Sequence, residues 1–223
     1  MLIGDFWCGT KSATQAFADK EDEIVSIDIM PSFQPTICKD ILDVTVDELR
    51  EFGEFDFIWA SPDCSVFSIA NLKQRHFGLP NTRPLTDKAR GMVERVQHTR
   101  DLLEALNPKH GFLIENPRGL LRKLPVMQGL PRRTVTYCSY FDGRMKPTDL
   151  WGPTPPTWVH RPPCHNENPL CHHERSARGQ DSGTMALDWE DRIKVPYELS
   201  YSLWRACSTA HDRDSWRTLE KWT

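Results

Sequence analysis

A cysteine follows directly after a short apolar run of the chain. Residues 55–60 are rich in aromatic side chains and are closed by Ser61 and Pro62, which favours a buried strand over a helix. Cys64 therefore lies just past the carboxyl end of a strand, where open α/β sheets bind their ligands. A thiol at this position is a candidate nucleophile. The alternative is a small buried hydrophobic residue, which is what most free cysteines are.

Two further predicted strands lead into polar residues. Residues 2–7 predict a strand, followed by a tight turn over residues 8–12 and a helix over residues 13–18. A glycine turn before a helix N-terminus can cradle a nucleotide cofactor, because free backbone amides point at the ligand. Residues 23–28 predict a second strand that ends in Asp28. This carboxylate could accept hydrogen bonds from both hydroxyls of a ribose, or it could be an ordinary solvated acid.

Composition sets the class of protein. A chain of 223 residues with 26% charged and 39% hydrophobic residues predicts a soluble, globular domain with a core of its own. No apolar run is long enough to span a membrane, and the first residues do not predict a signal peptide. Seven scattered cysteines favour a reducing, cytoplasmic setting over a disulfide framework. The net charge of -3 means that contacts to phosphate must come from local patches, and we expect a monomer.

The remaining elements alternate between strands and helices, which predicts an α/β fold with a doubly wound, mostly parallel sheet. A long polar stretch over residues 70–86 is typical of a binding loop or lid. We expect a catalytic and cofactor-binding domain over residues 1–150, a short loop-rich insert resembling a target-recognition region over 151–192, and a C-terminal helix returning to the domain over 193–223. The other predicted elements are a strand at 35–38, helices at 46–51 and 88–106 (the latter capped by Asp87), a strand at 111–117, paired strands at 134–140 and 146–151, and a last helix at 197–210.

Together these parts resemble one enzyme family. In chain order they are Asp5-Phe6-Trp7-Cys8-Gly9, Asp28, Asp40-Ile41, Pro62-x-Cys64-x-x-Phe67-Ser68, Glu115-Asn116, the basic pair Arg144 and Lys146, and Val195-Pro196. Their order and their places at strand ends resemble a compact DNA cytosine-C5 methyltransferase, over residues 3 to about 151 and again over 193–207. The resemblance implies a Rossmann-like fold that uses S-adenosylmethionine, and DNA as the partner.

The resemblance also implies a role for each matching position. The first turn would hold the methionine part of the cofactor, Asp28 its ribose, and Asp40 the adenine amino group. The full set of cofactor residues that it implies is Asp5, Phe6, Trp7, Cys8, Gly9, Thr10, Lys11, Ser12, Asp28, Ile29, Asp40, Ile41, Pro62 and Ser200. The residues expected to contact DNA are Ser65, Ser68, Lys73, Arg75, Arg161, Arg175 and Arg178.

In the catalytic set, the resemblance implies that Cys64 adds to C6 of a flipped cytosine and that Glu115 holds N3 and the exocyclic amine. Asn116 would brace the loop, and Arg144 or Lys146 would face the base or a phosphate. Covalent addition makes C5 nucleophilic enough to take a methyl group. Proton donation at N3 favours that addition. The base must leave the stack, because C5 and C6 cannot be reached in a duplex.

The chain departs from the family pattern at several positions. Asp63 stands where the family has a proline, and a carboxylate beside the nucleophile disfavours the thiolate. A cation, Arg144 or Lys146, should therefore offset it. Ser65 replaces a glutamine, and Lys11 replaces a glycine.

The insert carries a cluster of sulfur and imidazole groups. Cys164, His165, Cys171 and His172 form two closely spaced pairs, which could supply the four ligands of a tetrahedral zinc ion. The alternative is an irregular histidine-rich loop that contacts phosphate.

We interpret the chain as an enzyme that transfers a methyl group from S-adenosylmethionine to C5 of cytosine in DNA. One alternative is the same fold acting on RNA or on a modified pyrimidine. Another is an inactive module that binds cofactor and DNA, against which the intact pair of Cys64 and Glu115 argues.

Overall fold

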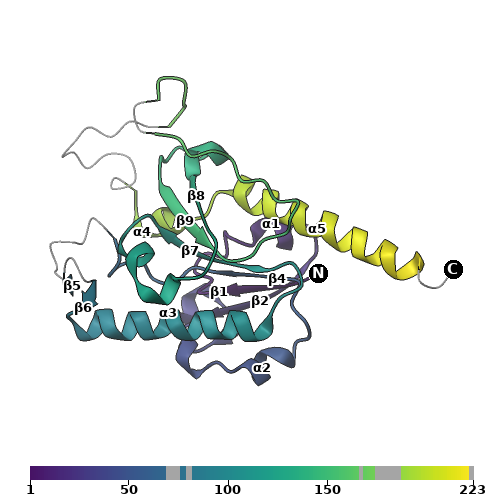
Figure 1. Cartoon of the computed structure of the whole chain (residues 1–223), viewed down its shortest axis with the longest axis horizontal. Coiled ribbons are helices and arrows are strands. Elements are labelled where there is room, and N and C mark those ends of the chain that lie inside the picture. The colour runs from purple at the N-terminus through teal and green to yellow at the C-terminus, as the bar shows by residue number, and fades with distance from the viewer. Residues whose placement is uncertain (69–75, 79–81, 166–167, 174–186, 221–223) are drawn as a thin grey trace.

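A seven-stranded sheet forms the centre of the molecule in the computed structural model (Figure 1). The structure describes residues 1–68, 76–78, 82–165, 168–173 and 187–220, the last ten of them by backbone only. The strand order is β3-β2-β1-β4-β7-β9-β8, and β9 alone runs antiparallel to its neighbours in this sheet. The strands are β1 (Leu2–Phe6), β2 (Glu23–Asp28), β3 (Ile37–Cys38), β4 (Phe57–Ala60), β7 (Phe112–Pro117), β8 (Arg132–Thr136) and β9 (Pro147–Trp151), with a separate hairpin of β5 (Phe77–Gly78) and β6 (Arg83–Pro84).

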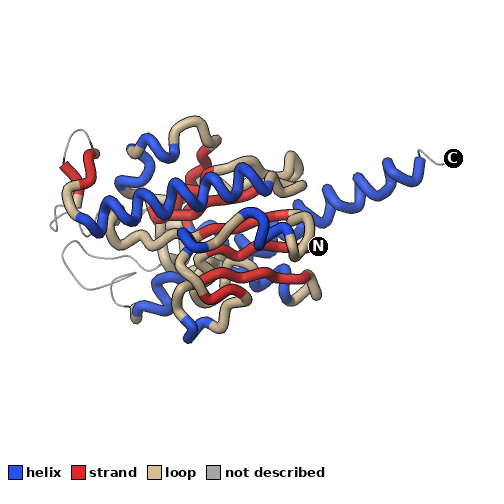
Figure 2. Tube along the Cα trace, turned by 90° about the horizontal axis from the view of Figure 1, so that it is seen from below, coloured by secondary structure: helices blue, strands red, loops and turns tan. Residues whose placement is uncertain are grey.

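Helices cover both faces of the sheet, as Figures 1 and 2 show together. On one face α2 and α3 share a hydrophobic core with Ile58 and Ala60. On the other, α1 and α5 pack with Phe57 and Trp59. Successive residues of β4 thus face opposite layers, which explains why this strand is apolar throughout. The helices are α1 (Gln15–Ala18), α2 (Val46–Arg50), α3 (Asp87–Leu106), α4 (Trp189–Ile193) and α5 (Tyr197–Glu220), with 3₁₀ helices at Pro31–Phe33, Ile41–Asp43, Leu120–Lys123, Pro125–Met127 and Tyr137–Tyr140 (η6).

The predicted doubly wound, mostly parallel sheet is confirmed, with its strand order reversing between β1 and β4. Some boundaries differ from the prediction. The predicted strand over 134–140 ends at Thr136, because the chain turns into η6 and Phe141 adopts a left-handed conformation with φ 62°. Thr86, rather than Asp87, caps α3 by accepting a hydrogen bond from Ala89 N. The short helix α4 was not predicted.

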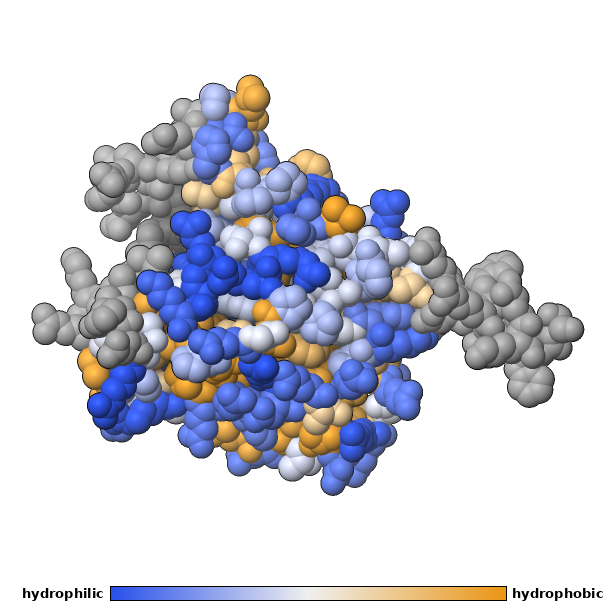
Figure 3. Space-filling model, in the orientation of Figure 1, coloured by the Kyte–Doolittle hydropathy of each residue, from blue (hydrophilic) through white to orange (hydrophobic). Residues whose placement is uncertain are grey.

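The face in Figure 3 is mainly hydrophilic, with hydrophobic residues interleaved among polar ones. Within the described part of the chain, neither α3 nor any other helix combines the length and apolar content needed to cross a membrane.

Asp5 is the one carboxylate of β1, and it is buried at the centre of the sheet. Burial raises the pKa of Asp5 to about 7, against the opposing effect of the hydrogen bond from Thr14. That bond joins Thr14 Oγ1 to Asp5 Oδ2 at 2.6 Å. When the pKa of a carboxyl is higher in the folded protein than in the unfolded chain, the folded state loses stability as the pH rises from the lower pKa to the higher one.

We therefore expect Asp5→Asn to gain stability relative to wild type as the pH rises from about 5 to about 8, by roughly 2–3 kcal/mol in the free energy of unfolding. Urea unfolding of both proteins across this range measures the difference, and groups that titrate alike in both cancel. Asp19→Asn, a change at an exposed acid, is the control and should show no such trend. Parallel curves for wild type and Asp5→Asn would mean that Asp5 ionises normally in the fold.

Candidate active site

Cys64 lies in a loop that begins where β4 ends, and neighbouring strands hold this loop on both sides. Ser61 N donates to Phe6 O of β1 at 3.0 Å. Asn116 Nδ2, at the end of β7, donates to Pro62 O at 2.8 Å in a buried hydrogen bond. This is the contact that a bracing role for Asn116 requires.

The second half of the loop is held by the segment after β7. Leu120 N donates to Phe67 O at 2.8 Å. A Cβ on Gly119 would lie 2.4 Å from the same oxygen, so this close approach requires glycine. Phe67 N and Ser68 N both donate to Cys64 O at 3.0 Å, which forms a tight turn directly after the thiol. The thiol therefore sits on a fixed backbone.

The charges around Cys64 oppose one another. Burial raises the pKa of the Cys64 thiol to about 11; Lys146 acts to lower it, while Glu115 and Asp63 raise it further. Asp63 accepts hydrogen bonds from Ser65 N at 2.9 Å and from Ser65 Oγ at 2.6 Å. The Asp63 carboxylate thus faces the Ser65 hydroxyl, in a hydrogen bond that is exposed to solvent. Lys146 is thus a cation that offsets the unusual acid.

Glu115 has a buried partner that the sequence did not indicate. Tyr137 Oη donates to Glu115 Oε1 at 3.1 Å, and both side chains are buried. Burial, followed by the charge of Glu115, raises the pKa of Tyr137 well above its ordinary value, so the phenol remains a hydrogen-bond donor at neutral pH. Lys146 Nζ lies 4.7 Å from the centroid of the Tyr137 ring. No local signal could have identified Tyr137, because it comes from the segment predicted as a continuous strand.

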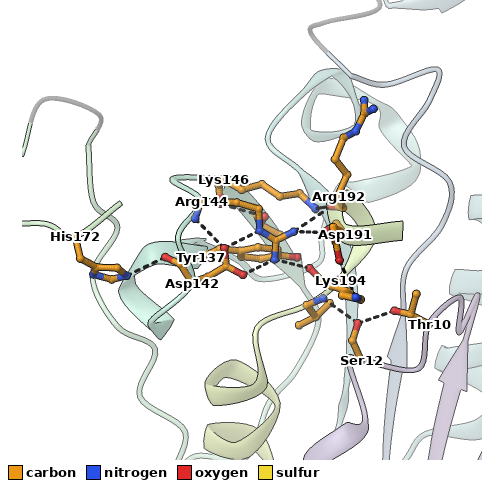
Figure 4. A network of polar contacts seen from close by, with 12 residues as sticks. Thr10, Ser12, Tyr137, Asp142, Arg144, Lys146, His172, Asp191, Arg192 and Lys194 are labelled. Carbon is orange, nitrogen blue, oxygen red and sulfur yellow. Dashed lines mark hydrogen bonds and ion pairs between the residues drawn. The ribbon is translucent and has the colours of Figure 1, made fainter. Parts of the chain in front are cut away.

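Arg144 lies in a network of polar contacts, and it joins two parts of the chain (Figure 4). Its guanidinium pairs with Asp142 and donates to Asp191 O at 2.5 Å and Lys194 O at 3.1 Å. It is buried and lies 5.3 Å from the centroid of the Tyr137 ring. Lys146 contacts the same segment, since its Nζ donates to Arg192 O at 3.2 Å, but it also acts to lower the pKa of Cys64, which Arg144 does not.

A cavity of about 240 Å³ opens at the carboxyl ends of β1 and β2. It contains five of the residues predicted to bind the cofactor, and Asp63 from the Cys64 loop. Its lining consists of Trp7, Ile27, Asp28, Ile29, Lys39, Asp40, Ile41, Asp63, Met92 and Arg95. A larger cavity of about 400 Å³ lies between residues 142–144 and 187–197, but neither Cys64 nor Glu115 lines it. Of these two cavities, the smaller one is lined by a residue of the Cys64 loop, Asp63.

Asp28 fixes the turn at one end of this pocket. Its Oδ2 accepts a hydrogen bond from Gly9 N, and its Oδ1 accepts one from Met30 N, both at 2.9 Å. Gly9, Trp7 and Lys11 all have positive φ, of 46°, 61° and 59°. The glycine predicted for the turn is thus needed by its left-handed backbone, and the carboxylate keeps lone pairs for a ligand.

Asp40, at the other end of the pocket, is paired with Arg95 of α3. Arg95 Nε lies 3.1 Å from both carboxylate oxygens, and Leu42 N donates to Oδ1 at the same distance. Hydrogen bonding by Arg95 lowers the pKa of Asp40. A ligand amino group at Asp40 would share its oxygens with Arg95, a residue that the helical pattern did not single out.

One buried polar atom of β1 lies just before the turn. Asp5 Oδ1 is buried and has no hydrogen-bond partner among the described residues. The pocket itself has an apolar and acidic lining, which fits a cofactor that carries a cationic amino group and a ribose.

The other predicted cofactor residues shape the turn or support it. Phe6 and Cys8 are buried in the protein, and Pro62 receives the Asn116 bond. Thr10 Oγ1 donates to Ser12 Oγ at 3.1 Å. Lys11 Nζ donates to Gln34 O at 2.6 Å.

Two serines join the C-terminal part of the chain to α1 and the turn before it. Ser12 Oγ accepts a hydrogen bond from Val195 N at 2.9 Å. Ser200 is fully buried and accepts one from Ala16 N at 3.2 Å. Ser200 therefore connects α5 to α1.

The metal-ligand set predicted from spacing is only partly correct. Cys164 and Cys171 do come together, but with Cys138 of η6 and with His173. His165 and His172 are exposed, and His172 Nε2 lies 2.9 Å from Asp142 O (Figure 4). His173 is buried, whereas its neighbour His172 is exposed.

Several residues expected to contact DNA lie outside the described part of the chain: Lys73, Arg75, Arg175 and Arg178. Ser68 and Ser65 lie on the Cys64 loop. Arg161 donates to Ser139 O at 2.7 Å and lies over the rings of Tyr140 and Phe141. It is half-buried rather than a free surface charge.

Comparison with solved structures identifies the fold. The chain is similar to a protein described as a DNA modification methyltransferase encoded within a prophage of E. coli, with 15% identity and a TM-score of 0.50, covering 69% of this chain and 46% of the other. It is also similar to the methyltransferase EhMeth of Entamoeba histolytica, with 12% identity and a TM-score of 0.52, covering 73% and 55%. The chain thus spans about half the length of these structures and shares their Rossmann-like methyltransferase fold.

No family model matches the chain. It is 30% identical over 156 residues to the protein of Frog virus 3 (isolate Goorha) named "Probable DNA (cytosine-5)-methyltransferase", which covers 68% of this chain and 70% of the viral protein. That identity extends over two thirds of both chains, and the order of strands and site residues agrees with it. The chain belongs to the DNA cytosine-C5 methyltransferase family.

Proposed function

We propose that this protein transfers a methyl group from S-adenosylmethionine to C5 of cytosine in DNA. The observation that carries the proposal is the placement of Cys64 where Glu115 and Lys146 both act on its thiol, on a loop that also lines the cofactor pocket through Asp63. DNA is favoured over RNA as substrate because the names of the viral relative and the prophage protein specify DNA.

The pocket residues divide the cofactor between them. Asp28 would accept the ribose hydroxyls, Ile29 and Ile41 would pack on the adenine, and Asp40 would accept from the adenine amino group. Asp5 Oδ1, buried in β1 just before the turn, would accept a hydrogen bond from the cofactor. When bound, S-adenosylmethionine supplies an electrophilic methyl group.

The chain's own residues perform the remaining chemistry on the base. The Cys64 thiolate forms a bond to C6 while Glu115 delivers a proton to N3, so that the π electrons gather at C5. C5 then takes the methyl group. A water molecule then takes the proton from C5, and that electron pair forms the C5–C6 double bond as the S–C6 bond breaks, which regenerates the thiolate. The proton on N3 returns to Glu115. Tyr137 orients Glu115 by donating to Oε1, and it leaves the carboxyl group's other oxygen to the base.

DNA contacts would come from the Cys64 loop and from the insert over residues 151–192. Ser65 and Ser68 follow Cys64 in its loop. Arg161 contacts η6 by donating a hydrogen bond to Ser139 O. Lys73, Arg75, Arg175 and Arg178 would add phosphate contacts in this proposal. The base must be flipped to reach the thiol, because C5 and C6 cannot be reached inside a stacked duplex.

The first test combines product analysis with covalent trapping. Wild type incubated with cofactor and DNA should yield 5-methylcytosine by mass spectrometry of nucleosides, and DNA carrying 5-fluorocytosine should leave a denaturant-stable adduct, because fluorine cannot leave C5 as a proton does. Cys64→Ala should abolish both and still bind cofactor, whereas Cys38→Ser, at an exposed thiol outside the loop, should retain both.

Three results would contradict the proposal. Methylation by Cys64→Ala would remove this thiol as the nucleophile. Methylated RNA with unmodified DNA would move the substrate to RNA. Cofactor and DNA binding without any product or adduct would leave an inactive binding module.

The second test concerns Asp28 and the ribose. Asp28→Ala should weaken S-adenosylmethionine binding by about 1.5–3 kcal/mol, because it removes charge-assisted hydrogen bonds to the cofactor. Isothermal calorimetry measures the loss. Glu23→Ala, at the exposed opposite end of the same strand, should bind as wild type does. Equal affinities in all three proteins would exclude Asp28 from the site.

The third test concerns the thiol. Because Lys146 lowers and Asp63 raises the pKa of Cys64, Lys146→Ala should slow alkylation of the Cys64 peptide and Asp63→Asn should speed it, each by roughly 3- to 10-fold at a given pH. Mass spectrometry of iodoacetamide-treated protein between about pH 7 and 10 follows the reaction. Lys194→Ala, whose ammonium pairs with Asp191, is the control. Identical rates in the three variants would show that neither charge acts on the thiol.

A further inference from the structure

Three thiols and one imidazole converge beside the active site. They belong to Cys138, Cys164, Cys171 and His173, and their ligand atoms all lie within 4.8 Å of one another. Cys138 comes from η6 and the others from the loop that follows β9. Cys138 and His173 are buried, at 2% and 4% exposure. The cluster is therefore enclosed and joins two separate segments of the chain.

The spacing of these atoms suits tetrahedral coordination. Cys164 Sγ lies 3.9 Å from His173 Nδ1. Zinc–sulfur bonds of about 2.3 Å and zinc–nitrogen bonds of about 2.0 Å place neighbouring ligand atoms roughly 3.5–3.8 Å apart. A contraction of about 1 Å or less would thus bring all four atoms to bonding distance of one ion.

Hydrogen bonds already form the loop around the cluster. Asn168 Nδ2 donates to Cys164 Sγ at 3.3 Å, a contact that favours a thiolate. Cys171 N donates to Asn168 O at 3.3 Å, which makes a turn that returns the chain to Cys164. Cys164 N donates to Thr136 Oγ1 at 2.7 Å and so anchors the loop at the end of β8. These hydrogen bonds hold Cys164 and Cys171 close together without a metal ion.

The ligand types select the metal and its role. Soft thiolates with an imidazole favour zinc over magnesium or calcium. Four protein ligands leave no open position, which is typical of structural zinc sites and not of catalytic ones.

We propose that Cys138, Cys164, Cys171 and His173 bind one Zn²⁺ ion, which fastens the loop after β9 to η6. Cys138 is the neighbour of Tyr137, which donates to Glu115. On the other side, His172 contacts Asp142, the partner of Arg144 (Figure 4). The ion would therefore hold in place the wall of the site that faces the target base, and this consequence for catalysis rests on the proposed function.

Metal content of the full-length chain tests the site without any turnover. Protein purified without chelator should contain about one zinc per chain by elemental mass spectrometry. After exchange with Co²⁺, its absorption spectrum should show tetrahedral thiolate coordination. Protein prepared under reducing conditions that contains no zinc and takes up no Co²⁺ would overturn the proposal.

Matched variants test the identity of the ligands. Cys171→Ser and His173→Ala should lose the metal, whereas His165→Ala and His172→Ala, at the adjacent exposed histidines, should keep it. Cys138→Ser should also lose it, and cofactor calorimetry shows whether each variant remains folded. Loss of zinc from the His165 and His172 variants with retention in the His173 variant would overturn the assignment.

The proposed consequence has its own measurement. Chelation of wild type should leave cofactor affinity unchanged, because no residue of η6 lines the cofactor pocket. It should lower kcat/KM for DNA, because Tyr137 of η6 orients Glu115. A uniform loss of cofactor binding would show that the metal supports the whole fold and not this wall.

Discussion

The register of three adjacent parallel strands brings the turn after β1, the Cys64 loop and Glu115 together. β4 lies between β1 and β7, with Ala60 paired to both Phe6 and Ile114. The turn, the Cys64 loop and Glu115 follow these three residues, so they meet at one edge of the sheet. A slip of one residue in β7 would turn Glu115 to the opposite face of the sheet, and no movement of a side chain could restore the site.

Burial at this edge makes charge the main problem that the fold must solve. Burial raises the pKa of Asp5 and of the Cys64 thiol. Burying such groups without hydrogen-bonding or charged partners would cost more free energy. Thr14, Lys146 and Tyr137 supply those partners from different elements. The same groups that reduce the cost of burial also orient the reactive atoms, so stability and chemistry depend on the same contacts.

Local patterns in the sequence were sufficient to predict the positions of residues that lie at the ends of strands. The bounds of β2, the turn at Gly9 and the loop at Cys64 could all be predicted, because apolar runs, glycine and proline act over a few residues. Arg95, Tyr137 and two members of the Cys/His cluster, Cys138 and His173, could not be. Arg95 meets Asp40 across 55 positions of the chain, and Cys138 meets the other cluster residues only because η6 interrupts a predicted strand. Contacts of this kind depend on packing, which no local pattern contains.

The segment after β9 shows why such contacts matter in a short chain. Among its described residues up to 173 there is no helix or strand, so it has neither a backbone ladder nor a core of its own to fix it. Side chains hold it to η6 instead. Ser139 Oγ donates to Pro162 O, and the Arg161 guanidinium donates to Ser139 O. Tyr140 Oη accepts a hydrogen bond from Arg161 N. Individual hydrogen bonds contribute only about 1 kcal/mol each. Binding of zinc to four protein ligands is far more favourable than any one of these hydrogen bonds. The zinc ion proposed above would therefore hold this irregular loop against η6 more firmly than the hydrogen bonds alone.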